Sequence, residues 1–245
     1  MILRGILIAL SLAVSSLAAP APTPSAVLRV GLDDNYPPYI FRNAEGDLQG
    51  ILPDTWRLWE KATGIRVELV AGDWDDILRR MRDGEFDVID TVFKTEARML
   101  WLDFSQPYAR LEVPIFYDAE ISGIRNAASL RGFAVATKRG DAAVELLTRQ
   151  GVEQILLFHN YEDVVRAARD GKVNVFVVDQ PPALYFLHRF GIRHRFKQTP
   201  PINIGEFHRG VRKGNTALLR RIEEGFARIP PRDLRHAEAA WQGSF

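Results

Sequence analysis

Short apolar runs alternate with amphipathic stretches from residue 27 onward. Residues 27–32 have the pattern of a buried strand, and residues 65–71 alternate apolar and polar positions with the period of a strand. Residues 53–64 and 73–84 instead carry apolar side chains on one helical face, and each segment ends at a glycine, which favours a helix C-terminus. This part of the chain therefore predicts two strand–helix pairs followed by a strand at 86–90.

The alternation restarts after Pro114. We expect strands at the short apolar runs and helices where apolar residues recur every three to four positions. The predicted strands are 132–138, 154–158, 173–179 and 193–199, and the predicted helices are 141–151, 161–171, 181–191 and the tail from residue 215. Strands that alternate with helices imply parallel sheets covered by helices on both faces. Two such runs predict an α/β protein with two lobes.

Polar residues follow the predicted strand at 86–90 directly. Thr91, Lys94 and Arg98 lie just past its carboxyl end. In α/β sheets, ligands bind beyond the carboxyl ends of the strands, and a cleft between two lobes would collect such residues from both sheets. The sequence therefore predicts that this segment meets a ligand.

Composition excludes several classes of function. The 245 residues are 47% hydrophobic and 26% charged, with a formal net charge of +1, and charges of both signs are interspersed. This is ordinary for a globular protein and lacks the basic stripe that a nucleic-acid surface needs. The absence of cysteine excludes disulfides and thiolate chemistry. The five histidines form no metal-binding motif, and no nucleotide-binding fingerprint occurs, so we predict neither a metal nor a cofactor.

The N-terminus has the features of a secretory signal peptide. Arg4 precedes an apolar run at 6–14, and small residues lead to a cleavage site expected after Ala18. The apolar run is short for a membrane anchor, because a spanning helix needs about 20 residues. We therefore predict a signal peptide at 1–18, a proline-rich leader at 19–27, and a periplasmic mature protein.

Seven segments, taken together and in order, resemble one protein family. They are VGLDDNYPPYIF, GDLQGILPDTW, DWDDILRRMRDGEFDVI, KTEARMLWLDFSQPY, SLRGFAVATKRGDAA, GKVNVFVVDQPPALYFL and EFHRGVRKGN. The chain resembles the periplasmic solute-binding proteins of family 3, the polar amino-acid type, and the related Venus-flytrap input domains of bacterial sensors. The resemblance implies a type II periplasmic-binding-protein fold with a ligand cleft between two lobes. Lobe 1 would comprise 28–112 and 206–245, lobe 2 would comprise 113–205, and the hinge would lie near 111–116 and 204–209.

The resemblance also implies a function. A monomeric extracytoplasmic protein or domain would close on a small polar ligand, an amino acid or a related compound. Its partner would be an ABC permease in transport, or a sensor kinase or cyclase module in signalling. The segments GEFDVIDTVFKTEAR and VFVVDQPPALYFL resemble the sensor-linked versions more closely. The alternative is a secreted cyclohexadienyl or arogenate dehydratase of the same fold. That reaction needs a positioned general acid, which the sequence does not mark, so we predict a binding protein rather than an enzyme.

Three ligand-binding residues follow from the resemblance. Arg98 would hold a ligand carboxylate, since a planar guanidinium binds it through two hydrogen bonds; the alternative is an ion pair with Asp103. Asp179 would accept hydrogen bonds from a ligand ammonium, or would cap the helix that follows it. Tyr36 would stack on the ligand, or would be a core aromatic residue.

The remaining candidates are less sharply defined. Asp33 and Trp74 are further ligand contacts, with helix-capping and core roles as the alternatives. The resemblance places Thr91 and Lys94 at the rim of lobe 1.

The pair Gly140–Asp141 departs from the family pattern. The family has threonine or serine after this glycine, at a helix N-terminus that binds the ligand carboxylate. Asp141 would cap the helix itself and would repel a carboxylate at this position. The departure therefore favours a cationic or neutral solute, or a different binding pose.

Overall fold

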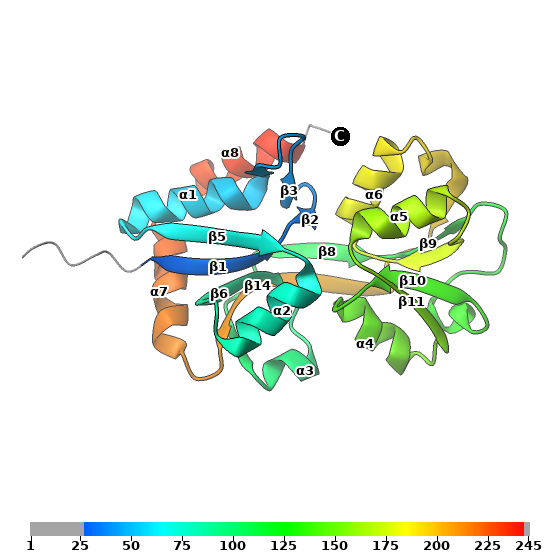
Figure 1. Cartoon of the computed structure of the whole chain (residues 1–245), viewed down its shortest axis with the longest axis horizontal. Coiled ribbons are helices and arrows are strands. Elements are labelled where there is room, and N and C mark those ends of the chain that lie inside the picture. The colour runs from blue at the N-terminus through cyan, green and yellow to red at the C-terminus, as the bar shows by residue number, and fades with distance from the viewer. Residues whose placement is uncertain (1–26, 243–245) are drawn as a thin grey trace, which may run out of the picture.

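The protein is described by a computed structural model over residues 27–242, so the predicted signal peptide and residues 19–26 of the leader lie outside the described residues. The chain forms two lobes, each built on its own sheet (Figure 1). We define lobe 1 as the part built on the sheet β5-β1-β6-β14-β7, and lobe 2 as the part built on the sheet β11-β10-β12-β9-β13.

Lobe 1 packs helices on both faces of its sheet. Figure 1 shows α1 and α8 on one face and α2 and α3 on the other. Its strands are β1 (Leu28–Asp33), β5 (Val67–Gly72), β6 (Val88–Val92), β7 (Leu102–Phe104) and β14 (Asn203–Arg212), with a small additional sheet of β2 (Asn35–Tyr36), β3 (Ile40–Arg42) and β4 (Leu48–Gln49). Its helices are α1 (Ile51–Thr63), α2 (Trp74–Asp83), α3 (Glu96–Met99), α7 (Thr216–Ala227) and α8 (Pro231–Gln242).

Lobe 2 is built on the second sheet, β11-β10-β12-β9-β13. Its strands are β9 (Ile115–Asp118), β10 (Ala134–Lys138), β11 (Gln154–Phe158), β12 (Val175–Val177) and β13 (Phe196–Gln198), and its helices are α4 (Ala142–Arg149), α5 (Tyr161–Arg169) and α6 (Gln180–Arg189), with short 3₁₀ turns at Ala127–Leu130 and Arg193–Arg195. Phe116 of β9 stacks on Phe176 of β12, with ring centroids 5.0 Å apart. Within residues 27–242, no helix combines the length and apolar character that crossing a membrane requires.

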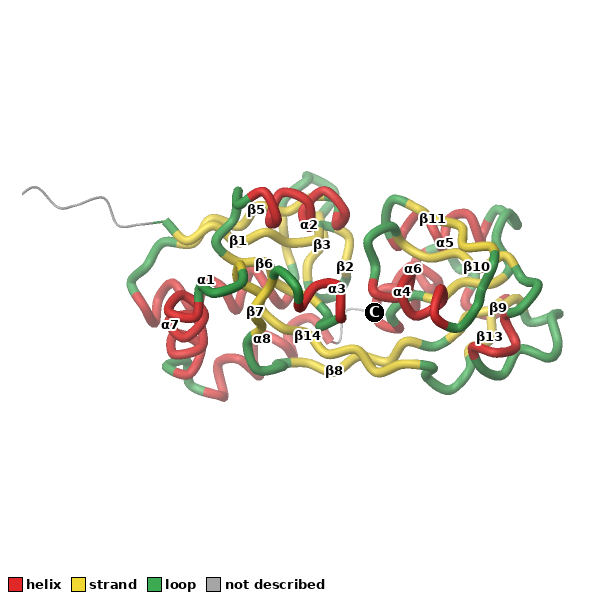
Figure 2. Tube along the Cα trace, turned by 90° about the horizontal axis from the view of Figure 1, so that it is seen from below, coloured by secondary structure: helices red, strands yellow, loops and turns green. Residues whose placement is uncertain are grey.

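Two strands connect the lobes. β8 (Ala109–Val113) pairs antiparallel with β14, from Ala109 opposite Phe207 to Val113 opposite Asn203. Figure 2 shows this pair running from one lobe to the other. The lobe boundaries expected after residue 112 and before residue 206 both fall within the paired segment. The boundaries themselves, and bending at this pair, stay predictions.

The sheets differ from the expected parallel arrangement. β1 pairs in parallel with β5 and β6, but β14 runs antiparallel to β6 and β7, and β9 runs antiparallel to β12 and β13. The sequence pattern did not predict β14 as a strand, because the polar residues His208 and Arg209 are buried in it. The tail predicted as one helix is two, because the consecutive prolines at 230 and 231 cannot continue α7.

The glycine at position 225 of α7 lets this helix approach α1 closely. A Cβ atom at Gly225 would lie 2.2 Å from Nε1 of Trp59, whose indole N–H donates to the carbonyl of Ile222 at 3.0 Å. Trp59 is 1% exposed and packs beside Trp56. The small residue is therefore required by packing, although glycine is unfavourable within a helix.

We predict that Gly225→Ala destabilises the protein even though alanine has the higher helix propensity. Overpacking against the Trp59 ring should lower the free energy of unfolding by about 1–3 kcal/mol. Urea denaturation of the wild type and the variant measures this. Glu224→Ala, at an exposed neighbouring position of the same helix, is the control and should change stability by less than about 0.5 kcal/mol. A Gly225→Ala variant as stable as the wild type would contradict the packing argument.

Candidate ligand-binding site

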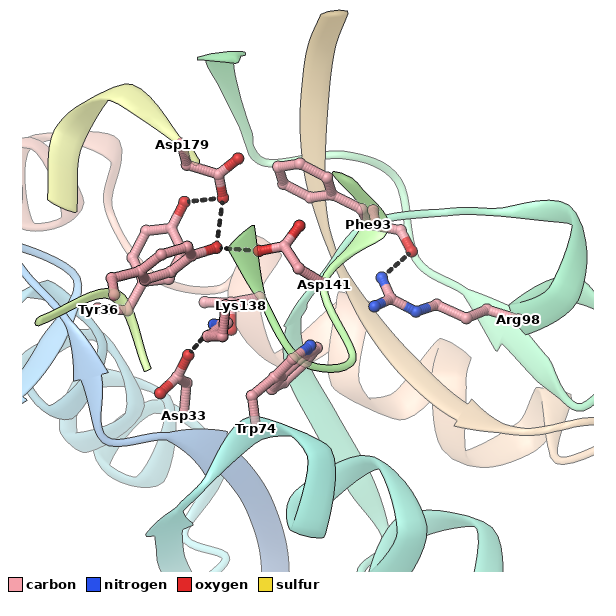
Figure 3. Close-up of a pocket in the computed structure, with 11 residues that line it drawn as sticks. Asp33, Tyr36, Trp74, Phe93, Arg98, Lys138, Asp141 and Asp179 are labelled. Atoms are coloured by element: carbon pink, nitrogen blue, oxygen red, sulfur yellow. Dashed lines mark hydrogen bonds and ion pairs between the residues drawn. The ribbon is translucent and has the colours of Figure 1, made fainter. Parts of the chain in front are cut away.

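A buried ion pair joins the two lobes at the ends of two strands. Asp33 is the last residue of β1 in lobe 1, and Lys138 is the last residue of β10 in lobe 2. Nζ of Lys138 lies 2.5 Å from Oδ2 of Asp33, and each residue is 2% exposed (Figure 3). A charge removed from water to this extent is tolerated only beside its partner. The pair therefore forms only while the lobes are together.

Aromatic rings surround the Lys138 ammonium. Its Nζ lies 3.9 Å from the ring centroid of Tyr161, 5.7 Å from that of Tyr36 and 5.6 Å from that of Trp74. A cation over an aromatic face is attracted by the ring quadrupole, more strongly when water is excluded. The rings expected to meet a ligand at Tyr36 and Trp74 thus face an ammonium group of the chain itself.

Two carboxyl groups share the neighbouring hydroxyl groups. The Tyr36 hydroxyl donates to Oδ2 of Asp179 at 2.5 Å, and the Tyr161 hydroxyl donates to Asp141 and lies 3.1 Å from Oδ2 of Asp179. One hydroxyl proton cannot serve two carboxylates, so full pairing needs a proton on one carboxyl group. Burial, followed by the charge of Asp141, raises the pKa of Asp179 to about 7, against the lowering effects of Tyr36, Lys138 and Tyr161.

Asp141 caps α4 and also accepts a hydrogen bond from Tyr161. Its Oδ1 accepts a hydrogen bond from the backbone N–H of Ala143 at 2.9 Å and so caps α4, while its other oxygen accepts from Tyr161. Asp179 also stands at a helix N-terminus, before α6, but its side chain makes no capping hydrogen bond. Its carboxyl group is instead directed to Tyr36, as Figure 3 shows, and lies 3.1 Å from the Tyr161 hydroxyl.

Arg98 links α3 of lobe 1 to the turn before α4 in lobe 2. Its Nη1 donates to the carbonyl of Phe93 at 2.8 Å, and its Nη2 donates to the carbonyl of Gly140 at 2.8 Å. The residue is 6% exposed, and burial lowers the pKa of its guanidinium. Asp103, the alternative partner, pairs instead with Lys213 at 3.1 Å. Among the described residues, two of the five guanidinium donors are therefore engaged, and three remain for another acceptor.

The backbone at Thr91 and Gly140 is unusual. Thr91 has φ of 57°, in the left-handed region that a β-branched residue rarely adopts and that costs about 1–3 kcal/mol. Gly140 has φ of 72°, and a Cβ atom there would lie 3.1 Å from Oδ1 of Asp75 across the cleft.

Lys94 is exposed and lines a neighbouring groove rather than the cavity at this site.

The cavity between these residues is small. Its volume of about 20 Å³ leaves room for about one water molecule. Its lining includes seven of the nine candidate residues together with four that sequence reasoning missed, which are Phe93, Lys138, Ala142 and Tyr161. Lys138 ends a strand that the sequence predicted, so its position at a carboxyl end was an available signal. A ligand as large as an amino acid requires the lobes to separate.

The fold and the cleft define a two-lobed solute-binding protein. The chain belongs to the bacterial extracellular solute-binding proteins, family 3, because the sequence profile of that family matches residues 28–244. The expected family and fold and the solute-binding class of function are thereby confirmed.

The relatives include both sensors and binding proteins. The chain is 24% identical over 221 residues to the virulence sensor protein BvgS of Bordetella pertussis, covering 89% of this chain but only 18% of BvgS. It is 23% identical to the probable histidine-binding protein of Neisseria gonorrhoeae, over 86% of this chain and 81% of that protein. A crystal structure of a histidine kinase sensor domain with similarity to periplasmic binding proteins superimposes with a TM-score of 0.82 at 25% identity, covering 89% of this chain and 96% of that one.

We predict that Lys138→Met shifts the protein toward an open arrangement of the lobes. The substitution leaves the Asp33 carboxylate buried without its partner, which should destabilise the closed form by about 3–5 kcal/mol. Opening returns that carboxylate to water, so the fold itself should survive. Small-angle scattering should show a larger radius of gyration for the variant.

Two further variants test the electrostatic origin of this effect. Lys172→Met removes an exposed lysine and should leave the scattering profile unchanged. Lys138→Met combined with Asp33→Asn removes both charges and should restore much of the closure, since no uncompensated charge remains. A Lys138→Met variant as compact as the wild type would contradict the role of the ion pair.

We predict that stability falls as pH rises toward and through about 7. The folded, closed protein binds a proton at Asp179 more tightly than a solvated aspartate does, so ionisation near its raised pKa weakens this form, by at most about 1.4 kcal/mol per pH unit. Below the ordinary aspartate pKa the carboxyl group is protonated in both the folded and the unfolded state. The slope of stability against pH is then zero, and the contribution of Asp179 to stability is fully present. Melting temperatures between about pH 5 and 8 measure the slope. Asp179→Asn should flatten it, whereas Asp47→Asn, at an exposed site, should not; equal slopes in all three proteins would refute the assignment.

Proposed function

We propose that the chain is an extracytoplasmic ligand-binding domain whose lobes close on a small polar solute at the Asp33–Lys138 cluster. The observation that carries the proposal is the convergence of buried charged and aromatic side chains from the strand ends of both lobes. Convergence at strand ends, together with a strongly shifted pKa such as that of Asp179, is typical of ligand sites in α/β proteins. Closure around the solute is the hinge motion that two-lobed binding proteins use.

The charges at the cleft favour an amino-acid-like solute with a cationic group. Asp33, Asp141 and Asp179 face two cations, Arg98 and Lys138, so the lining carries one more negative than positive charge when Asp179 is ionised. The three remaining donors of Arg98 suit a ligand carboxylate. An ammonium or guanidinium group would compete with Lys138 for the aromatic rings and the carboxylates. The name of the N. gonorrhoeae relative, a probable histidine-binding protein, supports this class of ligand.

We propose signalling as the first role and transport as the second. The similarity to a histidine kinase sensor domain and to BvgS supports the first, and the similarity to a histidine-binding protein supports the second. A reading frame that continues past Phe245 into a spanning helix would favour a sensor, and a neighbouring permease gene would favour transport. The named relatives are binding and sensor proteins, which does not favour the dehydratase alternative. We also propose export to the periplasm, which N-terminal sequencing of the mature protein tests.

Calorimetry with a panel of amino acids and amines tests the proposed function. Histidine, arginine, ornithine, glutamate and putrescine separate the demand for a carboxylate from the demand for a cation. A ligand of the proposed class should also raise the melting temperature, because binding stabilises the folded state by about 2.7 kcal/mol at a hundredfold excess over the dissociation constant. Failure of every member to bind, in a folded protein, would overturn the proposed ligand class.

We predict that Arg98→Ala removes binding of any carboxylate ligand that the panel identifies. Truncating one partner of a buried charge pair costs about 2–5 kcal/mol, a loss of more than tenfold in affinity. Calorimetry on the variant measures the loss, and circular dichroism verifies the fold. Arg131→Ala, at an exposed position, is the matched control and should bind as the wild type does. Undiminished affinity in a folded Arg98→Ala protein would exclude Arg98 from the site.

A further inference from the structure

A second cavity lies within lobe 1, separate from the cleft between the lobes. Its volume is about 360 Å³, within the range of small-molecule sites. The walls come from α1, α7 and α8 and from the two connecting strands, β8 and β14. This cavity and the one in the cleft have no lining residue in common. Much of its wall is apolar, formed by Ile51 and Leu52 of α1, Phe226 of α7 and Leu234 of α8.

Arg209 lines this cavity with an unusual lack of hydrogen bonds. Its side chain is 10% exposed, yet the guanidinium donates no hydrogen bond to any residue between 27 and 242. Its Cζ lies 3.3 Å from the ring centroid of Phe226 and 4.2 Å from that of Tyr108. Rings stacked against a guanidinium occupy its faces and leave its in-plane N–H groups available. Of its nitrogens, Nε is buried without a hydrogen-bond partner within residues 27–242, and buried polar groups are nearly always paired, so Nε indicates a missing acceptor.

The nearby carboxylate of Asp90 does not supply that acceptor. Its Oδ2 lies 3.5 Å from Nε of Arg209, beyond the usual length of a hydrogen bond. Its oxygens already accept from the Tyr108 hydroxyl at 2.6 Å, the Thr91 backbone N–H at 2.7 Å and the Trp56 indole at 2.8 Å. Asp90 therefore balances the charge of Arg209 while leaving the guanidinium donors unused.

We propose that this cavity binds a small monocarboxylate with a hydrocarbon body. Its carboxylate would accept hydrogen bonds from the in-plane N–H groups of Arg209, the geometry in which guanidinium and carboxylate pair most strongly. Its body would lie against Leu52, Phe226 and Leu234. Glu238 also lines the cavity but is exposed, so water screens its repulsion.

Benzoate, benzamide and benzylamine test the proposal with the intact chain. They share one ring and differ in charge, so a guanidinium site should bind benzoate at least about tenfold more tightly than the other two, as a hydrogen bond to a charged group implies. Saturation-transfer NMR and chemical-shift titration measure this binding. Equal binding of benzamide would overturn the proposal. So would no detectable binding of benzoate at about 10 mM, roughly ten times the dissociation constant of a weak, millimolar site.

Three variants locate the bound benzoate. Leu234→Trp fills the cavity without removing a charge, and Arg209→Met removes the guanidinium while keeping an apolar stem; each should weaken benzoate binding by about tenfold or more. Arg209→Met leaves the buried Asp90 carboxylate without a cation beside it, which can prevent folding. In that case Leu234→Trp still tests the site. Arg98→Met removes the guanidinium at the cleft and should leave benzoate binding intact. Binding that survives Leu234→Trp, or that only Arg98→Met abolishes, would place benzoate elsewhere and refute the site.

Discussion

The ion pair between Asp33 and Lys138 holds together the arrangement on which the cleft depends. Each charge is almost completely removed from water, and each is compensated by a partner on the opposite lobe. Burying an unpaired charge would cost several kcal/mol, so the closed form is favourable only with the pair intact. The same closure brings the rings of Tyr36 and Trp74 in lobe 1 to Lys138, and the Tyr36 hydroxyl to Asp179, in lobe 2. The contacts between the two lobes at the cleft therefore form together.

This arrangement makes the chain its own competitor for the cleft. The Lys138 ammonium occupies the surroundings that a cationic group of a solute would seek, beside carboxylates and aromatic rings. A ligand changes the equilibrium between open and closed lobes only to the extent that it binds the two states differently. A solute that replaces the internal ammonium must therefore supply at least equivalent interactions with Asp33 and the rings. Affinity and closure are set by the same side chains.

The cleft and the second cavity are connected through two adjacent residues of β6. Thr91 lines the cleft in a left-handed backbone conformation, and its N–H donates to the carboxylate of Asp90. The same carboxylate accepts from Trp56 and lies beside Arg209, which lines the cavity in lobe 1. The Asp90 interactions thus help to hold the strained backbone of Thr91. A buried polar network within lobe 1 supports the geometry of the ligand site.

The sequence by itself determined the succession of most strands and helices, the division into two α/β runs and the position of polar residues at strand ends. These are local properties, since periodicity, glycine caps and N-capping residues such as Asp141 act within a few positions. Only the tertiary structure decided which residues contact one another. Lys138 meets Asp33 across 105 residues and Tyr36 meets Asp179 across 143, distances in sequence over which no local pattern carries information. The buried charge on β14 was hidden for the same reason, because Arg209 is tolerated there only through aromatic rings and a carboxylate supplied by other segments.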